Sequence, residues 1–272
     1  MYDAESVWAT VRKVRESGPL VHNITNYVAM DLTANALLAF GASPAMVHAE
    51  EEVRDFVGIS AALVINIGTL SPSWVRSMVR AAETALSRGV PWVLDPVGAG
   101  ATPYRTSVAR DLSRRRPAVL RGNASEILAV AGESEITTRG VDSVHGSEHA
   151  VEVARDLASH LECVVAVTGA TDYVTDGARV VSVTSGHPMM TKVTALGCTA
   201  SALIGACLAV EQDALLAAAH ALAALGVCGD YAAEQSDGPG TLRWRLLDAL
   251  YVMDDRTLAR ARIEEVRSAS AA

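Results

Sequence analysis

Residues 192–201 have the sequence KVTALGCTAS, and the small-residue run ALIGA follows at positions 202–206. Apolar residues recur at helical spacing from Cys198 to about Val210, and nothing interrupts this pattern before Asp213. Residues 191–194 are polar and β-branched, which favours the end of an extended segment. We therefore expect a glycine-containing turn that joins an extended segment to a helix over residues 198–210.

The start of this expected helix is a candidate anion-binding position. The first amides of a helix, here those of Gly197, Cys198 and Thr199, have no partner within the helix. Together with the positive end of the helix dipole they favour an anion, most naturally a phosphate. The same position predicts a lowered pKa for the thiol of Cys198. On this stretch alone, an ordinary buried turn with an inert cysteine explains the pattern equally well.

Before this stretch, short apolar runs alternate with amphipathic segments, which predicts a layered α/β fold. We expect strands at 20–24, 45–47, 61–67, 91–94, 118–120 and 163–167, a turn at 121–123, and a hairpin of 173–175 with 179–183. We expect helices at 3–16, 31–40, 50–56, 72–88, 104–114, 125–131, 147–160, 198–210, 213–234, 240–255 and 256–268, and a surface loop at 132–143. Because no repeat or linker is recognisable, we expect residues 1–272 to form a single domain.

Composition excludes several classes of function. The net charge of −8 argues against nucleic acid as a partner, because a phosphate backbone needs a basic surface. There is no basic-then-apolar signal sequence, and the apolar run at 214–229 is short and interrupted by His220, so we expect no membrane span. The cysteines lack metal-site spacing, which indicates a reduced, cytoplasmic protein; they are Cys163, Cys198, Cys207 and Cys228.

Polar residues follow the expected strands, where ligands bind in open α/β sheets. The residues at these strand ends are Asn23, Thr25, Asn26, Met46, Asn66, Gly68, Asp95, Arg121, Asn123, Glu126, Thr168 and Gly169. Acids, amides and an arginine beside an anion-binding helix start suit phosphoryl transfer better than hydride transfer. No G-x-x-x-x-G-K-[ST], dinucleotide fingerprint or G-x-S-x-G is present, which argues against three common classes of active site.

Two acids among these residues are candidate ligands for a hydrated Mg²⁺. Asp95 ends a strand, and Asn123 and Glu126 lie on one helical turn, so their oxygens can face one point. Glu126 is alternatively a capping-box partner of Asn123, and Asp95 a turn former before Pro96. Arg121 is either a phosphate-binding residue or one half of a surface salt bridge.

Seven motifs, in order along almost the whole chain, resemble those of the hydroxyethylthiazole kinase family. They are PLVHNITN at 19–26, LLAFGASPAM at 37–46, VINIGTL at 64–70, DPVGA at 95–99, RGNASEI at 121–127, VTG at 167–169, and TKVT at 191–194 followed by GC at 197–198. The resemblance implies a ribokinase-like fold: a mostly parallel central sheet with helices on both faces and no separate lid domain. It also implies Mg²⁺- and ATP-dependent phosphorylation of 4-methyl-5-(2-hydroxyethyl)thiazole in thiamine salvage, by a homotrimer with active sites between subunits.

The resemblance also implies residue roles. The implied thiazole contacts are Met46, Asn26, Val28, Gly68 and Ala195. The implied ATP contacts are Arg121, Thr168, Asn123 and Gly169. Asp95 and Glu126 correspond to the acids that organise metal and phosphate, and Gly197 and Cys198 to the anion hole beside the acceptor alcohol.

The chain departs from the family pattern at two positions, because Ala195 and Leu196 stand where the family usually has a glycine and a small residue. In addition, Cys198 stands where the wider ribokinase group usually has an aspartate base. A Cβ at position 195 restricts the backbone and crowds the substrate or the γ-phosphate. Two other functions are therefore alternatives: a thiazole- or nucleotide-binding protein with little catalysis, and another ribokinase-fold enzyme such as hydroxymethylpyrimidine kinase or a hydrate repair enzyme.

Overall fold

The computed structural model describes residues 2–132 and 144–266. In these ranges the strands form one nine-stranded sheet with the order β2-β1-β3-β4-β5-β6-β7-β8-β9. The strands from β2 to β6 pair in parallel, and β7, β8 and β9 continue the sheet in antiparallel fashion. Their bounds are β1 (Leu20–Ile24), β2 (Ser43–Met46), β3 (Ala62–Asn66), β4 (Trp92–Asp95), β5 (Val119–Asn123), β6 (Val164–Thr168), β7 (Asp172–Thr175), β8 (Val180–Val183) and β9 (Ile263–Glu265).

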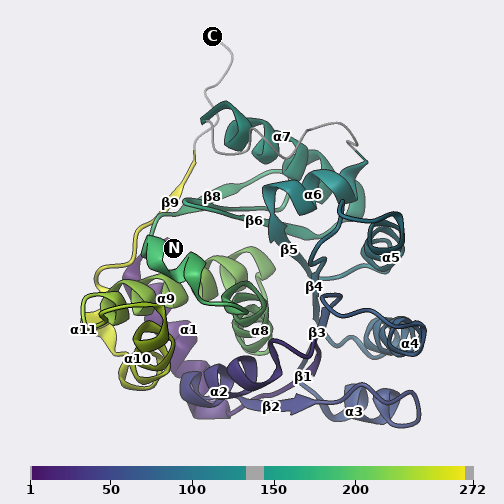
Figure 1. The fold of residues 1–272 in the computed structure, drawn as a ribbon, viewed down its shortest axis with the longest axis horizontal. Coiled ribbons are helices and arrows are strands. Elements are labelled where there is room, and N and C mark those ends of the chain that lie inside the picture. The colour runs from purple at the N-terminus through teal and green to yellow at the C-terminus, as the bar shows by residue number, and fades with distance from the viewer. Residues whose placement is uncertain (1, 133–143, 267–272) are drawn as a thin grey trace.

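Helices cover both faces of the sheet (Figure 1). One face carries α3 (Val53–Ile59), α4 (Pro72–Arg88), α5 (Pro103–Ser113), α6 (Ala124–Ala131) and α7 (Val144–Leu161). The other carries α1 (Ala4–Ser17), α2 (Met30–Phe40), α8 (Leu196–Leu208), α9 (Ala214–Ala233), α10 (Pro239–Val252) and α11 (Asp255–Leu258). The described ranges place every strand in this sheet and no separate lid beside it, which confirms the predicted fold class.

The central strands are apolar because both of their faces are covered. Every residue of β3 and of β4 is buried, and the two strands pair with Asn66 opposite Asp95. Parallel pairing brings the carboxyl ends of β1, β3, β4, β5 and β6 to one edge of the sheet. The polar residues at these ends are therefore gathered there, as the sequence predicts.

Helix α8 lies close against the sheet because its residues are small. A Cβ on Gly205 would be 2.7 Å from the side chain of Val64 on β3, so only glycine permits this approach. The neighbouring alanines of α8, Ala202 and Ala206, are fully buried in the hydrophobic core cluster that also contains Val64. The close approach sets the position at which the first residues of α8 reach the polar edge.

Local sequence signals fix several elements as expected. Helix α4 has the predicted bounds, Ser71 accepts the amide of Trp74 as the N-cap, and Gly89 ends the helix with a φ of +67°. The predicted hairpin is also confirmed, since β7 and β8 are antiparallel around Gly177, whose φ is +93°. In both cases the signal is local and needs no tertiary contact.

Three predicted elements are wrong. Residues 188–192 form the 3-10 helix η1 (Pro188–Lys192) instead of leading into an extended segment at 191–194. The expected turn at 121–123 is part of β5, which pairs with β6 as far as Asn123 and Thr168. The expected helix at 256–268 is replaced by the one-turn helix α11 and by β9, which adds to the edge strand β8.

Two further predictions concern the surface loop at 132–143 and the absence of a membrane span. The surface loop predicted at 132–143 lies, apart from Gly132, outside the described residues. Helix α9 is longer than the apolar run in the sequence indicated, and by length and composition alone it qualifies as a membrane-crossing helix. However, 78% of its most apolar 18-residue segment is buried inside the protein, and its His220 forms a hydrogen bond with Thr10 of α1. Helix α9 is thus a core helix of this fold.

Candidate active site

The turn before α8 has three amides without a partner in the helix, as the sequence predicts. They belong to residues 196–198, one position earlier than the predicted 197–199. Ala195 adopts a left-handed conformation with a φ of +67°, and the amide of Thr199 donates the first helical hydrogen bond, to the carbonyl of Ala195 (2.9 Å). The helix therefore begins at Leu196 rather than at Cys198. The amides that precede this bond are those of Leu196, Gly197 and Cys198.

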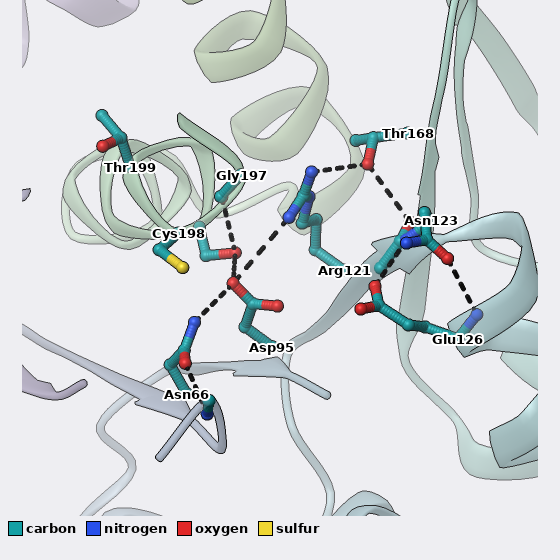
Figure 2. Close-up of polar contacts among 12 residues, drawn as sticks. Asn66, Asp95, Arg121, Asn123, Glu126, Thr168, Gly197, Cys198 and Thr199 are labelled. Carbon is teal, nitrogen blue, oxygen red and sulfur yellow. Dashed lines mark hydrogen bonds and ion pairs between the residues drawn. The ribbon is translucent and has the colours of Figure 1, made fainter. Parts of the chain in front are cut away.

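The guanidinium of Arg121 lies against this turn (Figure 2). A Cβ on Gly197 would be 2.7 Å from Nη1 of Arg121, so glycine is needed for this approach. Nη2 donates to the hydroxyl of Thr168 at the end of β6, and Nη1 is 3.8 Å from Oδ2 of Asp95. Arg121 is therefore held between the start of α8, β6 and β4, and it is not one half of a surface salt bridge.

Asp95 is the buried charge at the centre of the site. It is fully inaccessible to solvent, and burial raises the pKa of its carboxyl to about 6, with the charge of Glu126 also raising it and that of Arg121 lowering it. Its Oδ2 accepts hydrogen bonds from Ser201 (2.8 Å) and Asn66 (2.8 Å). Within the described residues its Oδ1 is buried without a hydrogen-bond partner. An orphaned carboxylate oxygen of this kind is available to a cation or a donor from a ligand.

A chain of side-chain amides links Asp95 to Cys198. Asn66 donates to Asp95 and accepts, through Oδ1, from Nδ2 of Asn26 (2.8 Å) and from the amide of Gly68 (2.9 Å). Nδ2 of Asn26 also donates to the sulfur of Cys198 (3.3 Å). A Cβ on Gly68 would be 2.6 Å from Nδ2 of Asn26, so glycine is required there too. Asn26, Gly68, Asp95 and Cys198 are thus brought together, as the sequence predicts.

The pKa of the Cys198 thiol is raised, whereas the sequence predicts that it is lowered. Its pKa is raised to about 11, first because the thiol is buried and second because of the charge on Asp95; hydrogen bonds from Asn26 and Asn66 and the charge of Arg121 lower it by less. The prediction of a lowered pKa is therefore wrong. Desolvation outweighs the helix start, and the thiol keeps its proton at neutral pH.

Glu126 and Asn123 form a capping box at the start of α6. The amide of Glu126 donates to Oδ1 of Asn123 (2.9 Å), and Oε2 of Glu126 accepts from the amide of Asn123 (2.9 Å). The other carboxylate oxygen, Oε1, accepts from the amide of Gly98 in the loop after β4 (2.9 Å). Glu126 thus caps its helix and at the same time holds the loop that follows Asp95.

The two acids fit a magnesium ion that is held mainly by other ligands. The described residues contain no group of three or more His, Cys, Asp and Glu side chains that would form a protein cage for a metal. Mg²⁺ usually takes one or two carboxylates and completes its shell with water and phosphate oxygens. Asp95, with its orphaned Oδ1, matches that requirement, and Glu126 is near enough for its charge to raise the pKa of Asp95.

The remaining predicted residues are Gly169, Met46 and Val28. The amide of Gly169 donates to Asp172 (2.9 Å), whose pKa is raised to about 6 by burial. Met46 ends β2, opposite Asn23 of β1, and is partly buried. Val28 lies in the turn after β1 with 61% of its surface exposed.

One predicted strand-end residue has an unexpected role, and two residues of the site were not predicted. Asn66 was visible at a strand end, but its role as the junction of the amide chain was not foreseen. Ser201 stands in an apolar helix one turn after Gly197, and that buried polar position was an available signal. Arg105 of α5 donates to three loop carbonyls, and no local sequence pattern marks it.

The sequence matches a known family over most of its length. Residues 11–256 match the profile described as the hydroxyethylthiazole kinase family. A relative from Syntrophus aciditrophicus (strain SB), named hydroxyethylthiazole kinase, is 53% identical over 257 residues, which cover 94% of this chain and 95% of the relative.

Solved structures agree with this match. The hydroxyethylthiazole kinase protein from Pyrococcus horikoshii OT3 is 44% identical, with a TM-score of 0.90 over 97% of this chain and 100% of that one. A ribokinase-like superfamily protein from Enterococcus faecalis V583, 14% identical, has a TM-score of 0.63 over 88% of each chain and shows the shared fold alone. The predicted ribokinase-like fold is confirmed, and the chain belongs to the hydroxyethylthiazole kinase family.

Proposed function

We propose that this chain transfers the γ-phosphoryl group of ATP to the hydroxyl of 4-methyl-5-(2-hydroxyethyl)thiazole. The hydroxyl oxygen forms a bond to the γ-phosphorus, the bond from that phosphorus to the β–γ bridging oxygen breaks, and the hydroxyl proton is released. The products are the thiazole phosphate and ADP. The observation that carries this proposal is the guanidinium of Arg121 beside the open amides of α8, next to the buried carboxylate of Asp95.

The phosphoryl group is stabilised at the start of α8. The amides of Gly197 and Cys198 donate hydrogen bonds and contribute the positive end of the helix dipole, and Arg121 adds a fixed positive charge. Thr168 orients Arg121 through its hydroxyl. Asn123 at the end of β5 and Gly169 directly after β6 complete the contacts to ATP. Because phosphoryl transfer depends mostly on positioning and charge stabilisation, this arrangement supplies most of what the reaction needs.

Asp95 and Glu126 are the residues that would hold the magnesium ion that accompanies ATP. When bound, Mg²⁺ neutralises charge on the phosphate oxygens and orients them. The residues themselves do two further things. Asp95 keeps Ser201 and Asn66 in place through its Oδ2, and Glu126 fixes the loop after β4 through the amide of Gly98.

The thiazole lies on the other side of Cys198, against Met46, Asn26, Val28, Gly68 and Ala195. Cys198 orients the acceptor hydroxyl, with its sulfur held by Nδ2 of Asn26. A protonated thiol is a poor base, which favours orientation over proton abstraction as its role. The methyl group of Ala195 restricts the space available to the substrate.

The chain acts as a homotrimer with active sites between subunits, as one domain over residues 1–272, in the cytoplasm. Exposed apolar side chains of α2, α10 and the turn after β1 support the assembly; they are Tyr27, Val28, Leu38, Trp244 and Tyr251. Four free cysteines support a reducing compartment. A single continuous sheet across the described residues supports one domain.

The experiment is ATP-dependent formation of thiazole phosphate by the purified chain, measured against a blank without enzyme and against hydroxymethylpyrimidine as substrate. Phosphate on the thiazole, dependent on Mg²⁺ and lost in an Arg121→Gln variant, is expected. Binding of both substrates without turnover would favour a binding protein, and preference for hydroxymethylpyrimidine would favour the other kinase. The family match does not favour either alternative.

A further inference from the structure

Two loops of the site are joined by one side chain from a helix outside it. The loop after β3 contains Ile67 and Gly68, and the loop after β4 contains Val97. Nη1 of Arg105 donates to the carbonyls of Ile67 (2.8 Å) and Val97 (3.0 Å), and Nη2 donates to the carbonyl of Gly68 (2.7 Å). Arg105 is therefore a bridge between two segments that are about 30 residues apart in the sequence.

Besides its contact with Arg105, each loop is hydrogen-bonded to a different part of the site. The amide of Gly68 donates to Asn66, which accepts from the same Asn26 that holds the sulfur of Cys198. The amide of Gly98, which directly follows Val97, donates to Oε1 of Glu126. The first loop thus belongs to the acceptor side, and the second belongs to the metal and phosphate side.

The start of α5 fixes Arg105 in this position. Pro103 opens the helix, and the hydroxyl of Thr102 caps it by accepting the amide of Arg105 (3.3 Å). The loop approaches closely, since Gly98 has a φ of +75° and a Cβ there would be 3.3 Å from Cδ of Arg105. The hydroxyl of Thr106 accepts the amide of Gly100 (2.9 Å), which ties the end of the loop to the same helix.

From these contacts we infer that Arg105 is a positioning residue for phosphoryl transfer, which keeps the acceptor-side loop and the phosphate-side loop at a fixed separation. The inference rests on the proposed function for the reaction that it serves. A guanidinium is suited to the task because its donors lie in one rigid plane and reach several carbonyls at once. A lysine keeps the charge but has a single nitrogen, and a glutamine has two donors and no charge.

The test compares Arg105→Gln and Arg105→Lys with Arg15→Gln. Arg15 of α1 is a matched control because its guanidinium also donates to three carbonyls, those of Leu250, Tyr251 and Met253 near the end of α10. Each variant is measured in three ways: steady-state kinetics with ATP and the thiazole, thermal melting, and hydrogen exchange of peptides covering 66–70 and 96–101. If Arg105→Gln does not fold, Arg105→Lys carries the comparison.

We expect Arg105→Gln to lower kcat/KM about 10- to 100-fold relative to Arg15→Gln at a comparable melting temperature, because a misplacement of about 1 Å costs about 100-fold. Both loop peptides exchange faster in both Arg105 variants, and Arg105→Lys does not restore the wild-type kcat. Kinetic constants within about twofold of those of Arg15→Gln, or full rescue by lysine, overturn the inference.

Failure of the proposed function is distinguishable from failure of this inference. If the wild-type chain leaves the thiazole unphosphorylated, the proposed function is wrong, and the exchange measurement still tests the bridge. Exchange in the 66–70 and 96–101 peptides that is the same in Arg105→Gln and Arg15→Gln overturns the bridge. Faster exchange in both peptides, confined to the Arg105 variants, supports it.

Discussion

Gly197 leaves the space that the guanidinium of Arg121 occupies, since a Cβ on Gly197 would lie 2.7 Å from Nη1 (Figure 2). Gly197 is the second residue of α8 and has no left-handed φ, so alanine suits the helix itself. We expect Gly197→Ala to fold with unchanged or slightly raised stability. Because the flexible end of Arg121 must move away, kcat/KM for ATP falls about 10- to 100-fold. Steady-state kinetics and thermal melting measure the two effects.

Gly240 provides the matched control for this substitution. It is the second residue of α10, and a Cβ there meets nothing within 4 Å. Gly240→Ala makes the same change at the same helical position without an arginine beside it. Equal kinetic constants for the Gly197→Ala and Gly240→Ala variants would show that the contact with Arg121 has no role in catalysis.

Ala195 has a left-handed backbone that costs an alanine free energy and a glycine almost none. Its φ is +67° and its ψ is 3°, directly before α8. We expect Ala195→Gly to raise the free energy of unfolding by about 0.5–1 kcal/mol, which is the left-handed penalty less the greater entropy of glycine in the unfolded chain. Chemical denaturation measures this change. A variant that is less stable than the wild type contradicts the assignment of strain to this residue.

Most of the fold follows from local patterns in the sequence. Strand β3 is a continuous apolar run, and helix α4 has a serine cap, a proline at its first position and a glycine after its end. The wrong predictions lie where tertiary pairing decides. Residues 263–265 become a strand because β8 offers an unpaired edge, and residues 121–123 continue as a strand because β6 lies beside them.

The part of the site that the sequence predicts is the set of residues at the ends of the strands. Asn26, Gly68, Asp95 and Arg121 follow strands that the pattern identifies, and parallel pairing brings them together. The pKa of Cys198 was not predictable, because it depends on burial by residues distant in the sequence. The bridge formed by Arg105 was not predictable either, since only folding brings the two loops within its reach.

Cys198→Asp tests whether the residue at this position orients the acceptor hydroxyl or accepts its proton. The thiol has a pKa raised to about 11, so it is protonated at neutral pH, whereas a carboxylate at this position can accept the hydroxyl proton. We expect Cys198→Asp to keep or raise kcat, and Cys198→Ala to lower it. The measurement is the initial rate of thiazole phosphate formation at saturating ATP.

The control for this pair is substrate binding, measured by calorimetry for each variant. A Cys198→Asp variant that folds, binds both substrates and does not turn over contradicts the proposed position of Cys198 beside the acceptor. Nδ2 of Asn26 remains available as a donor to the new carboxylate, as it is to the sulfur.

Asp95 gives the stability of the protein a specific pH dependence. Burial raises its pKa from 3.8 to about 6, so the folded state binds a proton more tightly than the unfolded state does. The stabilisation is fully present below the unfolded pKa of 3.8 and is lost as the pH rises through about 6. We expect the stability of Asp95→Asn relative to the wild type to rise by about 2 kcal/mol from pH 4.5 to pH 7.5.

Chemical denaturation of both proteins over this pH range measures the difference directly. Other groups that titrate in the same range, including Asp172 with its pKa raised to about 6, are present in both proteins and cancel in the comparison. A difference between the two proteins that is constant with pH would mean that the carboxyl of Asp95 titrates near its ordinary value.

Glu126→Gln separates the two roles of Glu126, as a helix cap and as a metal-organising acid. Its two carboxylate oxygens accept the amides of Asn123 and Gly98, and glutamine keeps one acceptor oxygen while it loses the charge. A cap alone predicts a loss of about 1 kcal/mol in stability and unchanged kinetics. The proposed function predicts in addition a lower kcat and a higher Mg²⁺ concentration for half-maximal rate.

Asp3→Ala is the control for the cap, because Asp3 accepts the amide of Ser6 in the capping box of α1, which is not part of the site. We expect Asp3→Ala to cost a similar stability and to leave the Mg²⁺ dependence of the rate unchanged. If Glu126→Gln has the same Mg²⁺ dependence as Asp3→Ala, Glu126 is a structural cap only, and Asp95 is left as the single carboxylate for the ion. Titration of the initial rate with Mg²⁺ at fixed ATP distinguishes the two results.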